Sequence, residues 1–352
     1  MRSLAHVEEI VAIDPIENAD AIEVATVLGW KVVVKKNEFK VGDKVIYIEI
    51  DSIVPETPYF EFLRNKNFKV KTIKLRGQIS QGLIVPITLV PSKYHKVGTD
   101  VTNVLKITKR DDSEAPRVID KKKHCKFVKW LLRFRFFRWL FTLGKKSKKD
   151  AFPSWVRKTD ETRIQNIPHV LKDKERRYVV TEKVDGCSAT YTLKKSGFKY
   201  KYVVASRNRV ADKDSVYHII SEKYNLEELL KTLFVCLDAH DHVTIQGEII
   251  APKVQGNKYK VQEPDFYVFN VIIDGERLCT MNAKFVVDKC LKFVPILDSW
   301  FELPDTVEEM LAMADGKSQL TDTLREGFVI RSDDGDVSFK VVSNKFLLKN
   351  NE

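Results

Sequence analysis

Alternating apolar and polar positions in the first third of the chain predict short β-strands. In residues 41–50 the isoleucines face one way and Tyr47 and Glu49 face the other, which predicts a half-buried strand. Residues 29–36 and 68–75 are further strand candidates, separated by Gly, Asn and Pro. Several short strands over residues 1–110 predict a small barrel such as an OB-fold.

Residues 151–352 carry a different pattern, with longer strands and amphipathic helices, so an α+β domain of antiparallel sheets and helices is expected. A helix near 305–315 has a capping box at Thr306 and Glu309 and a stop signal at Gly316. Further helices are expected near 215–235 and 282–293. Strands are expected at 178–183, 187–193, 198–206, 242–250 and 265–273, followed by a hairpin of 326–332 and 337–343 that turns at 333–335.

The segment 111–150 separates these two regions and differs from both in composition. Residues 121–149 hold 12 Lys and Arg and no Asp or Glu, with aromatic residues between the cations. A helical connector docked on the domains, a nucleic-acid contact and a membrane-surface helix all fit this pattern. We therefore expect three regions, 1–110, 111–150 and 151–352.

Composition and charge narrow the class of protein. The 43% hydrophobic residues exclude wholesale disorder, and a net charge of +11 favours an anionic partner such as nucleic acid. Most of that charge comes from 121–149. Five cysteines without a CxxC motif suggest reduced thiols, and neither a signal peptide nor a membrane span is evident. The sequence therefore predicts a soluble, intracellular protein that does not enter a membrane.

A lysine at a strand end marks the first candidate for chemistry. Lys183 ends an apolar run, Asp185 follows two residues later, and Gly186 permits a tight turn. A deprotonated lysine is a nucleophile when its surroundings remove the ammonium proton. On its own, this KVDG segment could equally be a solvated turn.

Other charges fall inside strand patterns with apolar neighbours, where an unpaired charge is costly. Glu248, Glu326 and Lys340 are of this kind, and Phe269 lies in a fourth apolar strand. Glu248 could also face outward, Glu326 and Lys340 could form a cross-strand ion pair, and Phe269 could be a core residue.

In their order along the chain these segments resemble the covalent nucleotidyltransferases, the superfamily of polynucleotide ligases and mRNA capping enzymes. The matching motifs are KVDG (183–186), SRN (206–208), YVFN (267–270), EGFVI (326–330) and SFKVVS (338–343). Only 12 residues follow Lys340, whereas DNA ligases and capping enzymes carry a further OB domain there. With 74–86 and 158–166 included, the chain resembles the Deinococcus/Naegleria type of ATP-dependent RNA ligase, which has an N-terminal OB domain.

This resemblance implies RNA sealing through lysyl-AMP and RNA-adenylate intermediates, as in RNA repair. Lys183 would attack the α-phosphate of ATP, AMP would pass to a 5′-phosphate end, and a 3′-OH end would then displace AMP. The cofactors implied are ATP and a divalent cation, Mg²⁺ or Mn²⁺. The implied partners are RNA ends or a nicked duplex containing RNA, and the protein is expected to act as a monomer.

The resemblance also assigns roles to individual residues. Asp185, Glu248 and Glu326 would hold the cation, through water in the case of Mg²⁺. Lys340 would contact the α-phosphate, and Arg163 the β- and γ-phosphates or a second metal. The remaining nucleotide contacts would come from Arg207 at the ribose, Phe269 and Glu182 at the adenine, and Gly186 beside the nucleophile.

Two departures from the family pattern bear on these roles. Asn270 stands where many members have an acid, so we assign it no metal role. Many relatives have a second lysine two residues after Lys340, where this chain has Val342; Lys345 is the next lysine and whether it fills that role stays open. Two other functions remain as alternatives, a DNA or mixed RNA/DNA nick ligase and a degenerate nucleic-acid-binding protein.

Overall fold

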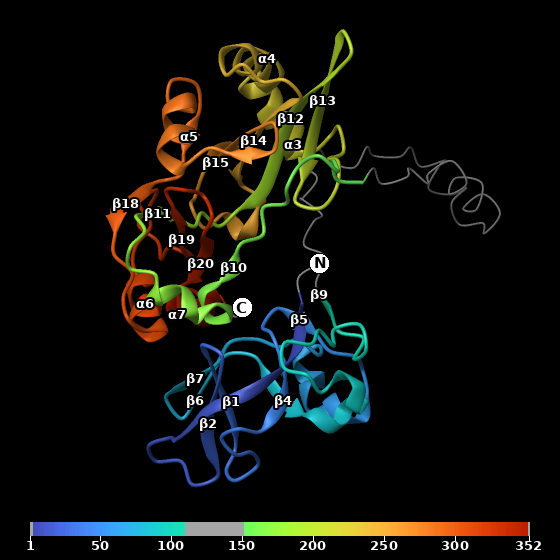
Figure 1. The fold of residues 1–352 in the computed structure, drawn as a ribbon, viewed down its shortest axis with the longest axis vertical. Coiled ribbons are helices and arrows are strands. Elements are labelled where there is room, and N and C mark those ends of the chain that lie inside the picture. Colours follow the sequence, from blue (N-terminus) through green and yellow to red (C-terminus); the bar gives the residue numbers. More distant parts are fainter. Residues whose placement is uncertain (1–2, 110–150, 351–352) are drawn as a thin grey trace, which may run out of the picture. The chain divides into compact units, whose positions relative to one another are not determined.

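The computed structural model describes residues 3–109 and 151–350, so the basic segment 121–149 lies outside the described residues. The chain forms two compact units (Figure 1). The barrel unit contains the described residues of Met1–Asp112, Glu161–Val184 and Pro295–Glu352, and the six-stranded unit contains those of Ser113–Asp160 and Asp185–Val294. Both sheets and helices are present in abundance, which confirms the α+β class.

The N-terminal part of the barrel unit is a curled antiparallel sheet in the order β3-β2-β1-β4-β8. Its strands are β1 (Ala5–Pro15), β2 (Ile22–Val27), β3 (Trp30–Lys35), β4 (Lys44–Ile48) and β8 (Leu83–Pro86). Two short ladders complete it, β5 (Ser52–Ile53) with β9 (Thr108–Lys109) and β6 (Ile73–Leu75) with β7 (Gln78–Ser80). Three 3₁₀-helices connect them, η1 (Pro58–Lys66), η2 (Ile87–Leu89) and η3 (Ser92–Tyr94).

The strand predicted in 41–50 is present, but the prediction that it is half-buried is wrong. Tyr47 is 0% exposed and Glu49 1% exposed. The cause is a second core on the far side of β4. Ile46 and Ile48 pack into one cluster, whereas Tyr47 packs into another around Trp30, so both faces of the strand are covered.

The strand predicted over 68–75 is only partly formed, since the regular ladder covers Ile73–Leu75 alone. The preceding residues are nevertheless held to the barrel by backbone hydrogen bonds. The N–H of Val70 donates to the carbonyl of Ser52 at 2.9 Å, and the N–H of Asp51 donates to the carbonyl of Val70 at 2.9 Å. This stretch is thus fixed in place without being a full strand.

The C-terminal part of the barrel unit is a five-stranded sheet in the order β10-β20-β19-β11-β18. Helices α6 (Val307–Ala314) and α7 (Asn344–Asn350) accompany it, and the capping box predicted at Thr306 and Glu309 is confirmed. The strands are β10 (Thr162–Arg163), β11 (Tyr178–Glu182), β18 (Ile296–Phe301), β19 (Gly327–Ser332) and β20 (Ser338–Val342), with η4 (Ile164–Asn166) and η5 (Pro168–Lys172) between the first two.

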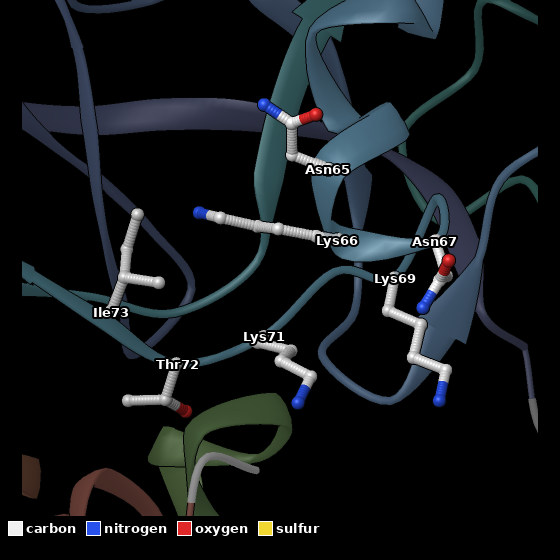
Figure 2. Close-up of a pocket in the computed structure, with 7 residues that line it drawn as sticks. All are labelled: Asn65, Lys66, Asn67, Lys69, Lys71, Thr72 and Ile73. Carbon is white, nitrogen blue, oxygen red and sulfur yellow. The ribbon is translucent and has the colours of Figure 1, made fainter.

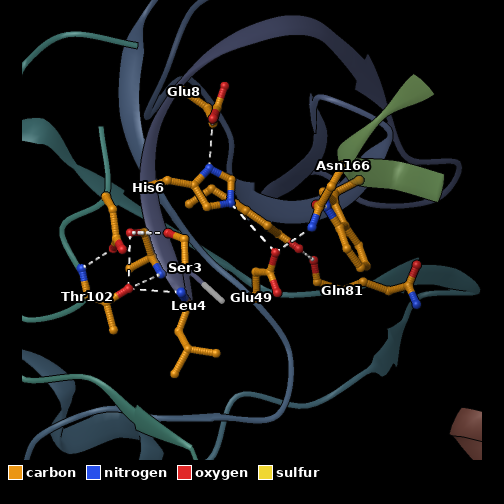
Figure 3. A network of polar contacts seen from close by, with 12 residues as sticks. Ser3, Leu4, His6, Glu8, Glu49, Gln81, Thr102 and Asn166 are labelled. Carbon is orange, nitrogen blue, oxygen red and sulfur yellow. Dashed lines mark hydrogen bonds and ion pairs between the residues drawn. The ribbon is translucent and has the colours of Figure 1, made fainter. Parts of the chain in front are cut away.

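This sheet and the barrel share a core and a polar network. Val342 and Leu347 belong to the same apolar cluster as Trp30, and the indole N–H of Trp30 donates to Asn166 at 2.6 Å. Figure 3 shows the rest of the network, in which Asn166 also contacts Glu49, at 2.6 Å, and His6 lies between Glu49 and Glu8. The segment after β10 is therefore anchored to the barrel.

The six-stranded unit is built on the antiparallel order β13-β12-β14-β15-β16, with β17 parallel to β15. Helix α4 packs on β12 and β14, α3 on β13 and α5 on β15. The helix predicted near 282–293 is shorter than expected, because it ends at Val287 and the chain then enters β17. The elements are β12 (Cys187–Ser196), β13 (Lys199–Ser206), α3 (Val216–Lys223), α4 (Leu226–Cys236), β14 (His242–Ile250), η6 (Gln255–Asn257), β15 (Asp265–Ile273), β16 (Glu276–Arg277), α5 (Thr280–Val287) and β17 (Lys292–Phe293).

Candidate active site

Lys183 lies directly after β11 and is held against the start of β19. Its backbone N–H donates to the carbonyl of Gly327 at 3.0 Å, and its Nζ lies 2.5 Å from Oε2 of Glu326. The two side chains are 22% and 14% exposed. Gly327 has a φ of 149°, and a Cβ there would overlap the carbonyl oxygen of Val341, so glycine permits the close approach. The predicted nucleophile and one predicted metal ligand are thus in contact.

Two further predicted cations come from neighbouring strands of the same sheet. Arg163 on β10 pairs in parallel register with Lys340 on β20, which is 7% exposed. The guanidinium of Arg163 lies 3.2 Å from Asp51 of the barrel. Within the described part of the chain its Nε and Nη1 are buried without a hydrogen-bond partner. Buried cationic donors of this kind suit an anionic ligand such as a phosphate.

Glu182 and Lys345 have separate surroundings in the barrel unit. Oε2 of Glu182 accepts a hydrogen bond from the N–H of Gln319 at 2.8 Å, and its Oε1 is buried without a partner among the described residues. Burial raises the pKa of Glu182. Lys345, on α7, is 69% exposed and lies 3.4 Å from Asp315. A role for Lys345 beside Lys340 stays a prediction.

The remaining predicted site residues belong to the six-stranded unit. Oδ2 of Asp185 lies 2.6 Å from Nζ of Lys258, and the N–H of Asp185 donates to the hydroxyl of Tyr259 at 2.9 Å. Gly186 passes so close to β14 that a Cβ would overlap the carbonyl oxygen of Ile249. The KVDG turn therefore requires glycine at 186 for steric reasons.

Glu248 and Phe269 lie on the neighbouring strands β14 and β15. A register shift between Gln246 and Gly247 leaves Phe269 at a bulge, half-buried rather than in the core. Glu248 pairs with Ser188 on β12, and burial together with the charge of Glu248 raises the pKa of the neighbouring Cys187 thiol to about 12.

Arg207 follows β13, and its Nε is buried without a partner among the described residues. Burial raises the pKa of Tyr217, and the charge of Glu248 raises it further. The nearby positive charge of Arg207 lowers it. Asn270 donates to Gln246 at 2.8 Å. Its Oδ1 is buried without a partner among the described residues, so the absence of a metal role for Asn270 stays a prediction.

Sequence reasoning missed the partners that hold these residues. Asp51 contacts Arg163, Lys258 contacts Asp185, and Gln319 contacts Glu182. The sequence holds only a weak indication of one of these partners, since Asp51 directly follows a predicted strand. Lys258 and Gln319 lie in stretches without periodicity.

No metal centre with direct protein ligands is assembled in the described ranges 3–109 and 151–350, where no group of three or more His, Cys, Asp or Glu could hold an ion. Nor does any helix in those ranges have the length and apolar character needed to cross a membrane.

Comparison with known proteins agrees with this arrangement. A profile of an OB-fold domain matches residues 4–87, and a profile of RNA ligases matches residues 176–342. An apo variant of Naegleria gruberi RNA ligase is 32% identical, with a TM-score of 0.81 over 98% of this chain and 97% of that chain. The chain belongs to the RNA ligase family.

Two further structures of the Naegleria gruberi RNA ligase are similar to this chain to the same degree. A variant with ATP and Mn is 31% identical, with a TM-score of 0.81 over 100% of both chains. A variant with AMP and Mn is 32% identical, with a TM-score of 0.81 over 98% of both chains. No curated protein sequence gives a significant match. The predicted resemblance and the barrel-plus-transferase architecture are confirmed for this RNA ligase.

Proposed function

We propose that this RNA ligase joins a 3′-OH end to a 5′-phosphate end of RNA at the expense of ATP, with Lys183 as the nucleophile. The observation that carries the proposal is the position of Lys183, which follows a buried strand and whose Nζ lies 2.5 Å from Glu326. A lysine fixed in this way has a defined direction of attack.

The reaction proceeds in three steps. Nζ of Lys183 loses a proton and attacks the α-phosphorus of ATP, so a P–N bond forms and pyrophosphate leaves. An oxygen of the RNA 5′-phosphate then attacks the same phosphorus, the P–N bond breaks, and RNA-adenylate forms. Finally the 3′-OH attacks the 5′-phosphate, a phosphodiester forms, and AMP leaves.

The cations of the barrel unit bind the phosphates in the first step. Arg163 has two buried donors without a partner among the described residues, and these donate hydrogen bonds to the β- and γ-phosphate oxygens. Lys340, its neighbour in the parallel pair, contacts the α-phosphate and balances charge as the phosphorus gains a fifth ligand.

The base and ribose are bound by residues from the stretch 182–269 of the transferase sequence. Phe269, half-buried at the bulge, stacks on adenine, and the buried Oε1 of Glu182 accepts a hydrogen bond at the adenine edge. Arg207 donates to the ribose through its buried Nε. Gly186 brings the backbone close beside the nucleophile.

The carboxylates Asp185, Glu248 and Glu326 fit a hydrated divalent cation, because hard oxygen ligands suit Mg²⁺ and Mn²⁺. When bound, the cation stabilises negative charge on the phosphates and, by engaging Glu326, disfavours the protonated form of Lys183. Support comes from the solved structures of the Naegleria enzyme, which contain ATP with Mn and AMP with Mn.

The test is incubation of the purified protein with α-labelled ATP and Mg²⁺ or Mn²⁺, followed by denaturing electrophoresis. The wild-type chain is expected to retain an acid-labile label, and Lys183→Ala is expected to retain none. The matched control is Lys231→Ala on α4, a half-buried lysine outside the candidate site that is paired with Glu227 and Glu228. Label retained by Lys183→Ala would refute the assignment of the nucleophile.

The substrate itself is tested separately. RNA ends, or a nick in a duplex whose 3′-OH end is a ribonucleotide, are the proposed substrates, and the enzyme acts as a monomer. Equal sealing rates on such nicks and on all-DNA nicks would favour a mixed nucleic-acid ligase instead. Sedimentation of the active enzyme measures its oligomeric state.

A further inference from the structure

A small cationic hollow lies on the barrel, in a stretch that the proposed mechanism does not use. Figure 2 shows its lining, in which the side chain of Lys66 extends from η1 in one direction and those of Lys69 and Lys71 extend in another. The hollow has a volume of about 270 Å³. This is below the range of about 300–1,000 Å³ typical of sites for drug-sized ligands. The complete lining is Asn65, Lys66, Asn67, Lys69, Lys71, Thr72 and Ile73.

The backbone brings these side chains together. Helix η1 ends at Lys66, and both Asn67 and Phe68 adopt positive φ, 50° and 56°, which reverses the chain sharply. The N–H of Lys69 then donates to the carbonyl of Lys66 at 3.1 Å. The backbones of Lys66 and Lys69 are thereby held next to each other.

Buried neighbours fix the direction of the lysine side chains. Phe68 is 5% exposed and Val70 3% exposed, and both belong to the barrel core. Because successive side chains of an extended chain point to opposite faces, Lys69 and Lys71 face outward on either side of Val70. The cations are therefore presented on a rigid segment.

The sequence around the hollow carries charge of one sign. Residues 64–76 contain six Lys and Arg and no Asp or Glu. Arg64 is engaged by Glu61 at 2.5 Å and does not line the hollow. Among residues 3–109 and 151–350, Lys66 and Lys69 form no ion pair with a carboxylate. Like charges on one surface repel one another, and an anion bound there lowers that repulsion.

We propose that Lys66, Lys69 and Lys71 form a binding site for the phosphodiester backbone of the RNA substrate. The inference rests on the proposed function and adds a contact outside the residues that bind ATP. Ammonium and amide groups line the hollow and no aromatic side chain does, so the chemistry suits phosphates rather than stacked bases. Such a contact holds RNA irrespective of sequence, as a sealing enzyme requires.

The test compares wild type with the double variant Lys66→Gln, Lys69→Gln. The probe is a nicked RNA duplex with 3′-OH and 5′-phosphate ends, titrated without ATP at several salt concentrations. The variant is expected to bind more weakly, and its plot of log K against log salt is expected to be shallower by about 2, roughly one for each lost contact. Lysine adenylylation by labelled ATP is expected to be unchanged.

The matched control is Lys36→Gln, Lys40→Gln, which removes the same charge from exposed lysines of the barrel outside the hollow. A similar loss of affinity and slope in this control would overturn the proposal, because net charge alone would then explain the effect. An unchanged slope in the Lys66 and Lys69 variant would also overturn it. Reduced adenylylation in that variant would assign the hollow to ATP rather than RNA.

These outcomes are distinct from a failure of the proposed function. If wild type neither retains AMP nor seals the nick, the function is wrong. If wild type seals the nick but the variant binds RNA with the same affinity and slope, only the phosphodiester site is wrong.

Discussion

Two carboxylates of the candidate site each contact a lysine, Glu326 with Lys183 and Asp185 with Lys258. A carboxylate removed from water is costly unless it is paired, and the lysines provide that pairing. A cation that binds these carboxylates must therefore compete with ammonium groups. Under the proposed function, a cation that binds Glu326 would release Lys183 from it and so couple binding of the cation to exposure of the nucleophile.

Gly186→Ala tests the steric role of Gly186, because it adds a single methyl group to the turn. Gly186→Ala would place a methyl group against the Ile249 carbonyl and the side chain of Glu248, and the turn cannot move far without displacing Asp185. We expect adenylylation to fall by at least tenfold, because misplacement of about 1 Å can cost about 100-fold in rate. The rate of label incorporation from ATP measures the effect.

Gly197→Ala is the comparison for this variant. Gly197 has a positive φ, 59°, but open space around it, and it lies outside the candidate site. The change costs stability through backbone strain while adenylylation stays normal. Equal rates in the two variants would argue against a steric role for Gly186.

The candidate catalytic residues could be predicted because each breaks a local pattern. Lys183, Glu326 and Lys340 are charges next to apolar strand residues, which is unusual in a sequence that only has to fold. Asp51 and Arg163 could not be paired in advance, since 112 residues separate them and neither position is periodic. Contacts of this range depend on the folded topology, which local alternation does not encode.

At the scale of elements, β4 shows why the strands were easier to predict than their burial. Alternation located the strand because Ile46 and Ile48 repeat with period two. It could not reveal that Tyr47 faces a second apolar cluster, which includes Leu347 from the far end of the sequence. A strand between two cores looks amphipathic when one of its faces carries a tyrosine and a glutamate.

The polar network between β1, β4 and η4 predicts a dependence of stability on pH. Burial alone lowers the pKa of His6, but hydrogen bonds and charge from Glu49 and Glu8 outweigh it and raise the pKa from 6.5 to about 9. Protonated His6 therefore stabilises the fold fully below pH 6.5, and this stabilisation is lost as pH rises through 9. It amounts to roughly 3 kcal/mol.

Denaturant unfolding of wild type and His6→Gln at several pH values measures this contribution. The difference in free energy of unfolding is expected to shrink between pH 6.5 and about 9. A constant difference across that range would mean that His6 does not titrate as its surroundings require.

At the scale of the whole molecule, we expect the barrel and the C-terminal sheet to unfold together. Val342 and Leu347 lie in the same apolar cluster as Trp30, and Asn166 bonds to both Trp30 and Glu49. Order along the chain therefore does not predict which parts unfold together.

Leu347→Ala tests this coupling. Removing a buried leucine costs about 2–5 kcal/mol. Because the cavity would open beside Trp30, amide hydrogen exchange is expected to accelerate in β1–β4 as well as in α7. Leu230→Ala, a buried leucine of α4 in the six-stranded unit, is the control and is expected to accelerate exchange around β12 and β14. Unchanged exchange in β1–β4 of Leu347→Ala would separate the barrel from the C-terminal sheet.

The cluster that joins Ile10 to Leu347 also has a consequence for biosynthesis. A ribosome adds about 5–20 residues per second, and an N-terminal domain ordinarily folds while the rest is being made. Here Val342 and Leu347 must leave the exit tunnel before they can complete that apolar cluster. Until then Trp30 and its neighbours remain open to chaperones, so the nascent chain is expected to depend on them longer than its small first domain would suggest.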